Sequence, residues 1–146
     1  MHRPRILLAD DHPDFLAITV QVVESKFDCE VVKTFDDGQA IVNEAAELDP
    51  DLFVLDISMP GLNGIEAALQ LRAAGRKGKI VFLTGHEDQD YLRSALATGA
   101  LGYVLKARMA TDLVPALRQA LVGQQFVSQS MLSEESALRD PHSSLI

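Results

Sequence analysis

Residues 52–64 read LFVLDISMPGLNG, and this stretch decides the fold. An apolar run from Leu52 to Leu55 is followed by one carboxylate, Asp56, and then by a Met-Pro-Gly turn. A short apolar run between turn signals predicts a strand that is buried on both faces, as in a parallel sheet. Open α/β sheets bind ligands at the carboxyl ends of such strands. A charged Asp56 at this position therefore needs a cation or hydrogen-bond donors close to it.

Four other segments have the character of strands, and each strand is followed by a segment with helical periodicity. With residues 52–55, the predicted strands are residues 6–9, 29–35, 80–83 and 102–105. Helix starts are predicted at Pro13, within residues 36–38 (Asp-Asp-Gly), and at Asn63, Asp88 and Thr111, from proline at the first turn and from capping side chains. Strand and helix alternate five times, which predicts an α/β, flavodoxin-like (βα)5 doubly wound parallel sheet with strand order 2-1-3-4-5.

The composition favours one domain with an aliphatic core. Only 5% of the 146 residues are aromatic and none is tryptophan. In the third predicted helix, Ile65 and Leu69 are expected to face the sheet. Residues 1–123 are predicted to form the domain, and residues 124–146, which are serine-rich from Ser128, a linker or disordered tail.

The charge balance bears on possible partners. Thirteen Lys and Arg against 21 Asp and Glu give a net charge of −8, which argues against direct nucleic-acid binding by this chain and against anionic membranes. No apolar run approaches the ~20 residues of a membrane span, and residues 1–5 show no signal-peptide pattern. We therefore expect a cytoplasmic location. The single Cys29 excludes an internal disulfide and is expected to be a half-buried strand residue.

Polar side chains gather where the predicted strands end. Asp10 and Asp11 follow the first strand, Asp56 the third, Thr84 the fourth and Lys106 the fifth. In a parallel sheet these ends share one edge, so three carboxylates converge and require a cation. Oxygen ligands without a histidine or cysteine cluster indicate Mg²⁺. The alternative is that the acids cap helices and that Lys106 and Thr84 are ordinary strand-end residues, but their convergence favours a site.

The chemistry that fits this set is phosphoryl transfer to Asp56. A carboxylate can act as the nucleophile and form an acyl phosphate. The ammonium of Lys106 and the hydroxyl of Thr84 are suitable partners for the phosphoryl oxygens. Two alternatives remain open from the residues alone. One is a phosphatase with an aspartyl nucleophile, and the other is a protein-interaction domain that is not phosphorylated.

Four strings carry a family resemblance: LLADDHP, LFVLDISMPGLNG, IVFLTG and GYVLK, which together span about Arg5 to Val122. With these strings the sequence resembles a response regulator receiver domain of bacterial two-component systems. The ADDHP start and the Gly-x-x-x-x-Val-Ser stretch from Gly123 to Ser128 are similar to the receivers of LuxR/FixJ-type DNA-binding regulators. The resemblance implies that Asp56 accepts a phosphoryl group from a sensor histidine kinase or a phosphotransfer protein, and that the chain is a signalling module rather than an independent enzyme.

The resemblance also assigns the metal ligands. It implies that Asp11, Asp56 and the backbone carbonyl of Ser58 bind Mg²⁺ directly, with Asp10 acting through water. Lys106 would pair with the phosphoryl group. The face made by the fourth helix, fifth strand and fifth helix would change on phosphorylation, and homodimerisation could accompany that change.

Two further residues are implied as switches, and the family pattern is broken at one point. Thr84 and Tyr103 would reorient together, although simple packing is an alternative for Tyr103. By resemblance, Ser58 and His86 could adjust the lifetime of the phosphate, whereas an exposed loop position is the other interpretation of His86. Many receivers carry proline directly after the lysine, but here residues 107–108 are Ala-Arg.

Overall fold

Six parallel strands form one sheet in the order β2-β1-β3-β4-β5-β6 in the computed structural model, which describes residues 2–131. The strands are β1 (Arg5–Ala9), β2 (Glu30–Phe35), β3 (Leu52–Leu55), β4 (Lys79–Thr84), β5 (Gly102–Leu105) and β6 (Phe126–Val127). The predicted flavodoxin-like order 2-1-3-4-5 is confirmed. A short sixth strand, which the sequence did not predict, extends the sheet beside β5.

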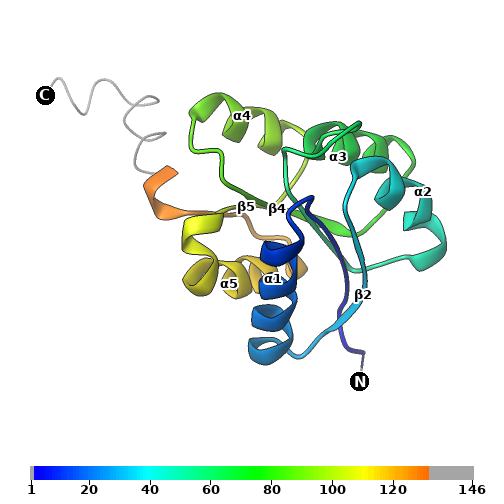
Figure 1. The fold of residues 1–146 in the computed structure, drawn as a ribbon, viewed down its shortest axis with the longest axis horizontal. Coiled ribbons are helices and arrows are strands. Elements are labelled where there is room, and N and C mark those ends of the chain that lie inside the picture. The colour runs from blue at the N-terminus through cyan, green and yellow to red at the C-terminus, as the bar shows by residue number, and fades with distance from the viewer. Residues whose placement is uncertain (1, 132–146) are drawn as a thin grey trace, which may run out of the picture.

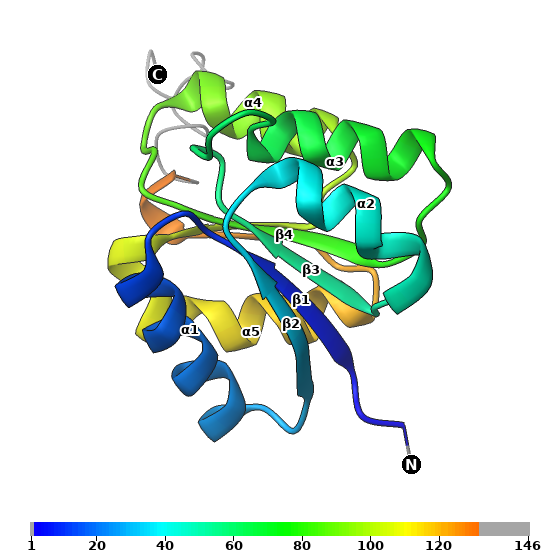
Figure 2. The same ribbon diagram turned by 45° about the vertical axis from the view of Figure 1, so that its right-hand side comes forward.

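Helices cover both faces of the sheet. They are α1 (Pro13–Lys26), α2 (Gly38–Leu48), α3 (Gly64–Ala73), α4 (Gln89–Ala97) and α5 (Met109–Leu121), with a short 3-10 helix, η1 (Lys106–Arg108), before α5. Figure 1 shows the arrangement, and in Figure 2 helices α2, α3 and α4 lie above the sheet while α1 and α5 lie below it. The doubly wound layering predicted from the alternation is therefore present.

Local side-chain signals explain where most helices begin. The Asp37 carboxylate accepts a hydrogen bond from the Ala40 amide at 2.7 Å and caps α2. Asn63 and Glu66 form the predicted capping box of α3, with bonds of 2.9 and 3.0 Å. The predicted cap at Thr111 is wrong. Helix α5 starts two residues earlier because η1 leads directly into it, which also places Pro115 inside the helix.

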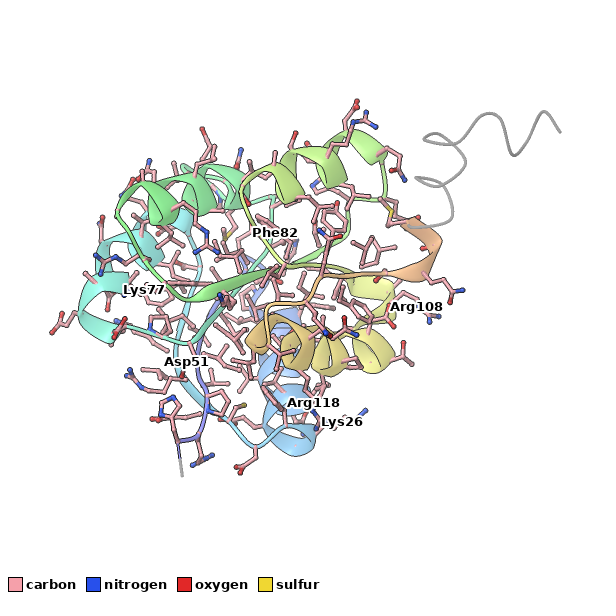
Figure 3. The ribbon with its side chains drawn as sticks, turned by 180° about the vertical axis from the view of Figure 1, so that it is seen from behind. Lys26, Asp51, Lys77, Phe82, Arg108 and Arg118 are labelled. Carbon is pink, nitrogen blue, oxygen red and sulfur yellow. The ribbon has the colours of Figure 1, made fainter. Side chains whose placement is uncertain are left out.

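Two hydrophobic cores lie on opposite faces of the sheet. Successive residues of β3 alternate between them: Phe53 packs with α2, α3 and α4, and Val54 packs with α1 and α5. Phe82, labelled in Figure 3, lies in the first of these cores. In α3 the predicted inward position of Leu69 is wrong, since this side chain is 52% exposed. The buried residues of α3 are Gly64, Ala67, Ala68 and Leu71.

The small residues of α3 have a steric reason. A Cβ atom at Gly64 would lie 2.0 Å from the carbonyl oxygen of Asp56, so α3 can begin this close to the end of β3 only with glycine there. Alanines on the next turn keep the helix close to the sheet. The same close approach fixes the backbone immediately after Asp56.

The ordered domain continues past Gly123, where the sequence predicted the start of a linker. Phe126 and Val127 pair with Gly102 and Tyr103 of β5, and Val127 is buried. A two-residue strand has too little periodicity to be detected in the sequence, but backbone pairing with an open sheet edge holds it in place. Residues 132–146, the rest of the predicted linker or tail, lie outside the described residues. Within residues 2–131, no helix has the length and apolar character needed to cross a bilayer.

Candidate phosphoryl-transfer site

The register of β1 and β3 brings the predicted acidic residues together. Ala9 pairs with Leu55, and the Asp56 amide donates a hydrogen bond to the Ala9 carbonyl at 2.9 Å. Asp10 and Asp56 therefore leave two neighbouring strands at the same level. Both side chains are buried, and Asp11 follows at the mouth of the site.

Asp56 is a buried carboxylate with few hydrogen-bond donors. It is 3% exposed; its Oδ1 accepts the Ile57 amide hydrogen at 2.7 Å, and its Oδ2 lies 3.0 Å from Lys106 Nζ. Burial raises the pKa of Asp56 above its ordinary value, and the hydrogen bond and charge of Lys106 act in the opposite direction. The nearby Asp10 charge raises this pKa further. Burial and Asp10 therefore disfavour the ionised form of Asp56, and Lys106 favours it. An added cation would favour the ionised form further.

Lys106 is the cation that the structure already supplies. Its Nζ lies 2.9 Å from Asp10 Oδ2 and 3.0 Å from Asp56 Oδ2, so one ammonium serves two carboxylates. Burial lowers the pKa of Lys106, but its hydrogen bonds to the two aspartates outweigh burial and raise the pKa overall. The ammonium also lies 4.5 Å from the centre of the Phe15 ring, a cation–π contact that the sequence did not predict.

The oxygen atoms around the pocket fit a hard divalent cation. Ligand atoms of Asp10, Asp11, His12 and Asp56 all lie within 4.8 Å of one another. Among the described residues, the buried Asp11 Oδ1 accepts no hydrogen bond, although His12 Nδ1 lies 3.1 Å from it. A buried carboxylate oxygen without a donor calls for a partner. Carboxylate oxygens are the ligands that Mg²⁺ prefers, so the residues present fit the predicted ion.

His12 was not predicted to belong to this site. It is the residue before the first turn of α1, its amide donates to Asp10 Oδ1 at 2.9 Å, and its Nδ1 is 3.1 Å from the same oxygen. The signal in the sequence was its position between Asp11 and Pro13, where the chain turns from β1 into α1 at the edge of the site.

The two predicted switch residues meet at the backbone of His86. Thr84 is buried, and within residues 2–131 its hydroxyl is bonded to the His86 amide, at 3.2 Å, rather than to Asp56. Tyr103 is fully buried and donates its hydroxyl hydrogen to the His86 carbonyl at 2.7 Å. Burial raises the pKa of Tyr103.

The side chain of His86 is also engaged. Its Nε2 lies 2.5 Å from Ser58 Oγ, and its ring stacks on Tyr91 with centroids 4.1 Å apart. His86 lies in the loop between β4 and α4, as predicted, but its side chain is half-buried rather than exposed. The sequence offered no signal for this contact, because Ser58 and Tyr91 lie on different elements.

A pocket of about 650 Å³ lies directly in front of Asp56. Its lining includes Asp11, His12, Phe15, Ser58, His86 and Lys106. Acidic, cationic and hydroxyl groups therefore face a space large enough for a phosphorylated group.

Comparisons with known proteins agree with this geometry. Residues 6–118 match the family model of the response regulator receiver domain. The chain is 37% identical over 126 residues to the nitrate/nitrite response regulator protein NarL of Escherichia coli (strain K12), covering 86% of this chain and 58% of NarL. It is 35% identical over 150 residues to the transcriptional regulatory protein LiaR of Bacillus subtilis (strain 168), covering 97% of this chain and 70% of LiaR.

A solved structure gives the same result at the level of the fold. The crystal structure of a LuxR-family two-component response regulator from Aurantimonas sp. SI85-9A1 superposes with a TM-score of 0.90 at 30% identity, covering 94% of this chain and 99% of that one. The chain belongs to the response regulator receiver family of two-component systems, and its relatives are regulators of the LuxR family.

Proposed function

We propose that this domain accepts a phosphoryl group on Asp56 in a magnesium-dependent reaction, and that a sensor histidine kinase or phosphotransfer protein is the donor. The observation that carries the proposal is the buried Asp56 carboxylate, which shares Lys106 with Asp10 at the base of an open pocket. A structural carboxylate would be expected to have donors of its own. Asp56 instead stands beside a second acid that competes for the same cation.

The ligands proposed for Mg²⁺ are Asp11, Asp56 and the backbone carbonyl of Ser58, with Asp10 acting through water. The Asp11 Oδ1, which accepts no hydrogen bond from the described part of the chain and has the His12 ring nitrogen beside it, and the cluster of carboxylate oxygens support this set. When bound, the ion supplies positive charge that offsets the charge of the phosphoryl oxygens.

In the proposed transfer, an Asp56 carboxylate oxygen forms a bond to phosphorus while the phosphorus–nitrogen bond of the donor phosphohistidine breaks. The electron pair of that bond returns to the imidazole nitrogen of the donor. Lys106 faces the incoming phosphoryl oxygens with a fixed ammonium. No further residue is needed as a proton acceptor when the attacking carboxylate is ionised, the form that the hydrogen bond and charge of Lys106 favour.

The acyl phosphate carries about −1.5 to −2 charges where the ionised carboxylate carried −1, so the charge beside Thr84 and Lys106 becomes more negative by about 0.5 to 1. We propose that Thr84 and Tyr103 then reorient and change the face formed by α4, β5 and α5. Both hydroxyls are bonded to the backbone of His86, so both act on the loop that leads into α4. Ser58 and His86, which touch at the pocket rim, are proposed to affect the lifetime of the phosphate.

The chain spans 58% of the length of NarL, so the function of the whole protein is also a proposal. We propose that it is the receiver part of a cytoplasmic transcriptional regulator, with homodimerisation as a consequence of phosphorylation. The net charge of −8 supports the proposal that DNA is contacted outside this chain.

The test is modification of the full chain by acetyl phosphate with Mg²⁺, followed by intact mass spectrometry. Wild type should gain one phosphoryl group and Asp56→Asn should gain none. Asp112→Asn, which changes another buried carboxylate outside the pocket, should still gain one phosphoryl group. Equal modification of wild type and Asp56→Asn would refute the assignment, and an unmodified wild type would favour the interaction-domain alternative.

A further inference from the structure

Residues 126–131 cover the edge of the sheet at β5, and we call them the C-terminal latch. In Figure 1 their ribbon lies between α4 and α5, and Figure 3 shows the same placement from behind. The Phe126 amide donates to the Leu101 carbonyl at 2.8 Å, and the Ser128 amide donates to the Tyr103 carbonyl at 2.9 Å. Val127 and Met131 are buried. The latch therefore occupies part of the face that receivers of this kind are proposed to change.

A buried polar cluster holds the latch in one register. The Ser128 side chain is 0% exposed, donates its hydroxyl hydrogen to Asp112 Oδ2 at 2.8 Å and accepts the Leu105 amide hydrogen at 3.1 Å. Thr111 donates a second hydroxyl to Asp112 at 3.0 Å. Because β6 ends at Val127, the Ser128 hydroxyl takes the place of a main-chain acceptor for Leu105. Buried polar groups with all their hydrogen bonds made fix the register of the segment, whereas apolar contacts alone would allow several registers.

The residues of β5 that hold the latch also reach the phosphoacceptor site. Tyr103 binds Ser128 through its carbonyl and His86 through its side-chain hydroxyl. Leu105 binds Ser128 through its amide, and the next residue, Lys106, binds Asp10 and Asp56. The latch and the site are therefore connected through β5 and the residue that follows it: the backbone of Tyr103 and Leu105 binds Ser128, and the side chains of Tyr103 and Lys106 bind His86 and the two aspartates.

We propose that phosphorylation of Asp56 releases the C-terminal latch. The inference rests on the proposed function, because it needs a phosphoryl group at Asp56. New phosphoryl oxygens compete with Asp10 for Lys106 and draw the end of β5 towards the pocket, away from Ser128. Leu105 and Tyr103 bind Ser128 at the edge of β5 that faces away from β4. Release frees the β5 edge between α4 and α5.

Linkage makes the proposal testable in both directions. If phosphorylation weakens the latch, then weakening the latch must favour the phosphorylated state by the same factor. Ser128→Ala removes the hydroxyl that joins Asp112 to Leu105 without adding bulk. The matched control is Ser130→Ala, which changes an exposed serine of the same segment.

The first measurement is amide hydrogen exchange of the full chain with and without beryllofluoride and Mg²⁺. We expect the amides of Phe126 and Ser128 to exchange about tenfold faster with the phosphate mimic, as for a local opening. Ser128→Ala should show fast exchange without the mimic, and Ser130→Ala should behave as wild type. Asp112→Asn provides a second variant if Ser128→Ala does not fold.

The second measurement is the affinity for beryllofluoride by titration calorimetry. Ser128→Ala should bind it about fivefold more tightly than wild type or Ser130→Ala, within the usual range of coupling between sites. If residues 84–86 respond to the mimic while exchange at residues 126–128 and the affinity of Ser128→Ala stay unchanged, the latch proposal fails and the proposed function stands. If no residue responds to the mimic, the proposed function fails and the latch proposal fails with it.

Discussion

Two buried aspartates, Asp56 at the end of β3 and Asp112 on α5, show how one residue type can serve structure or chemistry. Asp112 is buried on α5 and accepts neutral hydroxyl donors from Ser128 and Thr111. Asp56 is equally buried, but it shares one ammonium with another carboxylate and faces a pocket. The first carboxylate has its partners within the fold. Asp56 shares the Lys106 ammonium with Asp10, so a further cation can bind beside it, as a phosphorylation site requires.

The largest contrast is expected between the cations beside the two carboxylates. Lys106→Met should lower the free energy of unfolding by about 3 kcal/mol, because it leaves two adjacent buried charges without a partner. Arg108→Met should lower it by less than about 0.5 kcal/mol, because an exposed ion pair contributes little. Arg108 is 51% exposed and lies 3.6 Å from Asp112. Urea denaturation without Mg²⁺ measures the free energy of unfolding of both variants. Equal losses would show that the two cations contribute alike to stability.

Neutralising each aspartate should change stability in opposite directions. Asp112→Asn should lower the free energy of unfolding by about 1.5 kcal/mol, because the hydroxyls of Ser128 and Thr111 lose a charged acceptor. Asp56→Asn should raise it by about 1 kcal/mol, because repulsion from Asp10 and the cost of a buried charge disappear. Urea denaturation at neutral pH without Mg²⁺ gives both values. Changes of the same sign would show that the two environments are alike.

Mg²⁺ should stabilise only one of the two regions. At ten times its dissociation constant it should raise the free energy of unfolding of wild type by about 1.4 kcal/mol. Asp11→Asn and Asp56→Asn should lose this gain, since each removes a proposed ligand, and Asp112→Asn should keep it. Thermal denaturation with and without the ion is the measurement. A gain retained by Asp11→Asn would exclude that residue as a ligand.

The smallest effect is the pH dependence of Asp56. Its pKa is raised on folding, so the folded state binds this proton more readily than the unfolded state does. The resulting stabilisation is complete below the unfolded pKa of about 3.9 and is lost as the pH rises through the folded value. The advantage of Asp56→Asn, about 1 kcal/mol at neutral pH, should therefore shrink on acidification towards about pH 4. Melting temperatures of the two proteins across this range test the sign, and a widening gap would contradict it.

The residues around Asp56 could be predicted from the sequence. Asp10, Asp56 and Lys106 each follow a short apolar run, and parallel strands place such residues at one edge. The structure confirms that these three side chains meet within hydrogen-bonding distance. The strand order was equally accessible, since alternating strands and helices leave few topologies.

The surroundings of Asp112 could not be predicted from the sequence. Ser128 and Asp112 lie sixteen residues apart on segments whose pairing depends on an open sheet edge, and the sequence of the segment suggested a linker. His86 likewise gained its role from neighbours on other elements, Ser58 and Tyr91. The inward face of α3 was misjudged because large apolar residues were preferred, whereas close approach at Gly64 required small ones.

The sequence by itself determined the layers, the strand order and the carboxylates at the strand ends, because periodicity and turn chemistry are local and the right-handed crossover rule does the rest. Only the tertiary structure decided which buried aspartate is satisfied and which is not. Burial and the supply of donors depend on distances between residues far apart in the chain, and those distances exist only after the sheet, its helices and the strand beyond β5 have packed together.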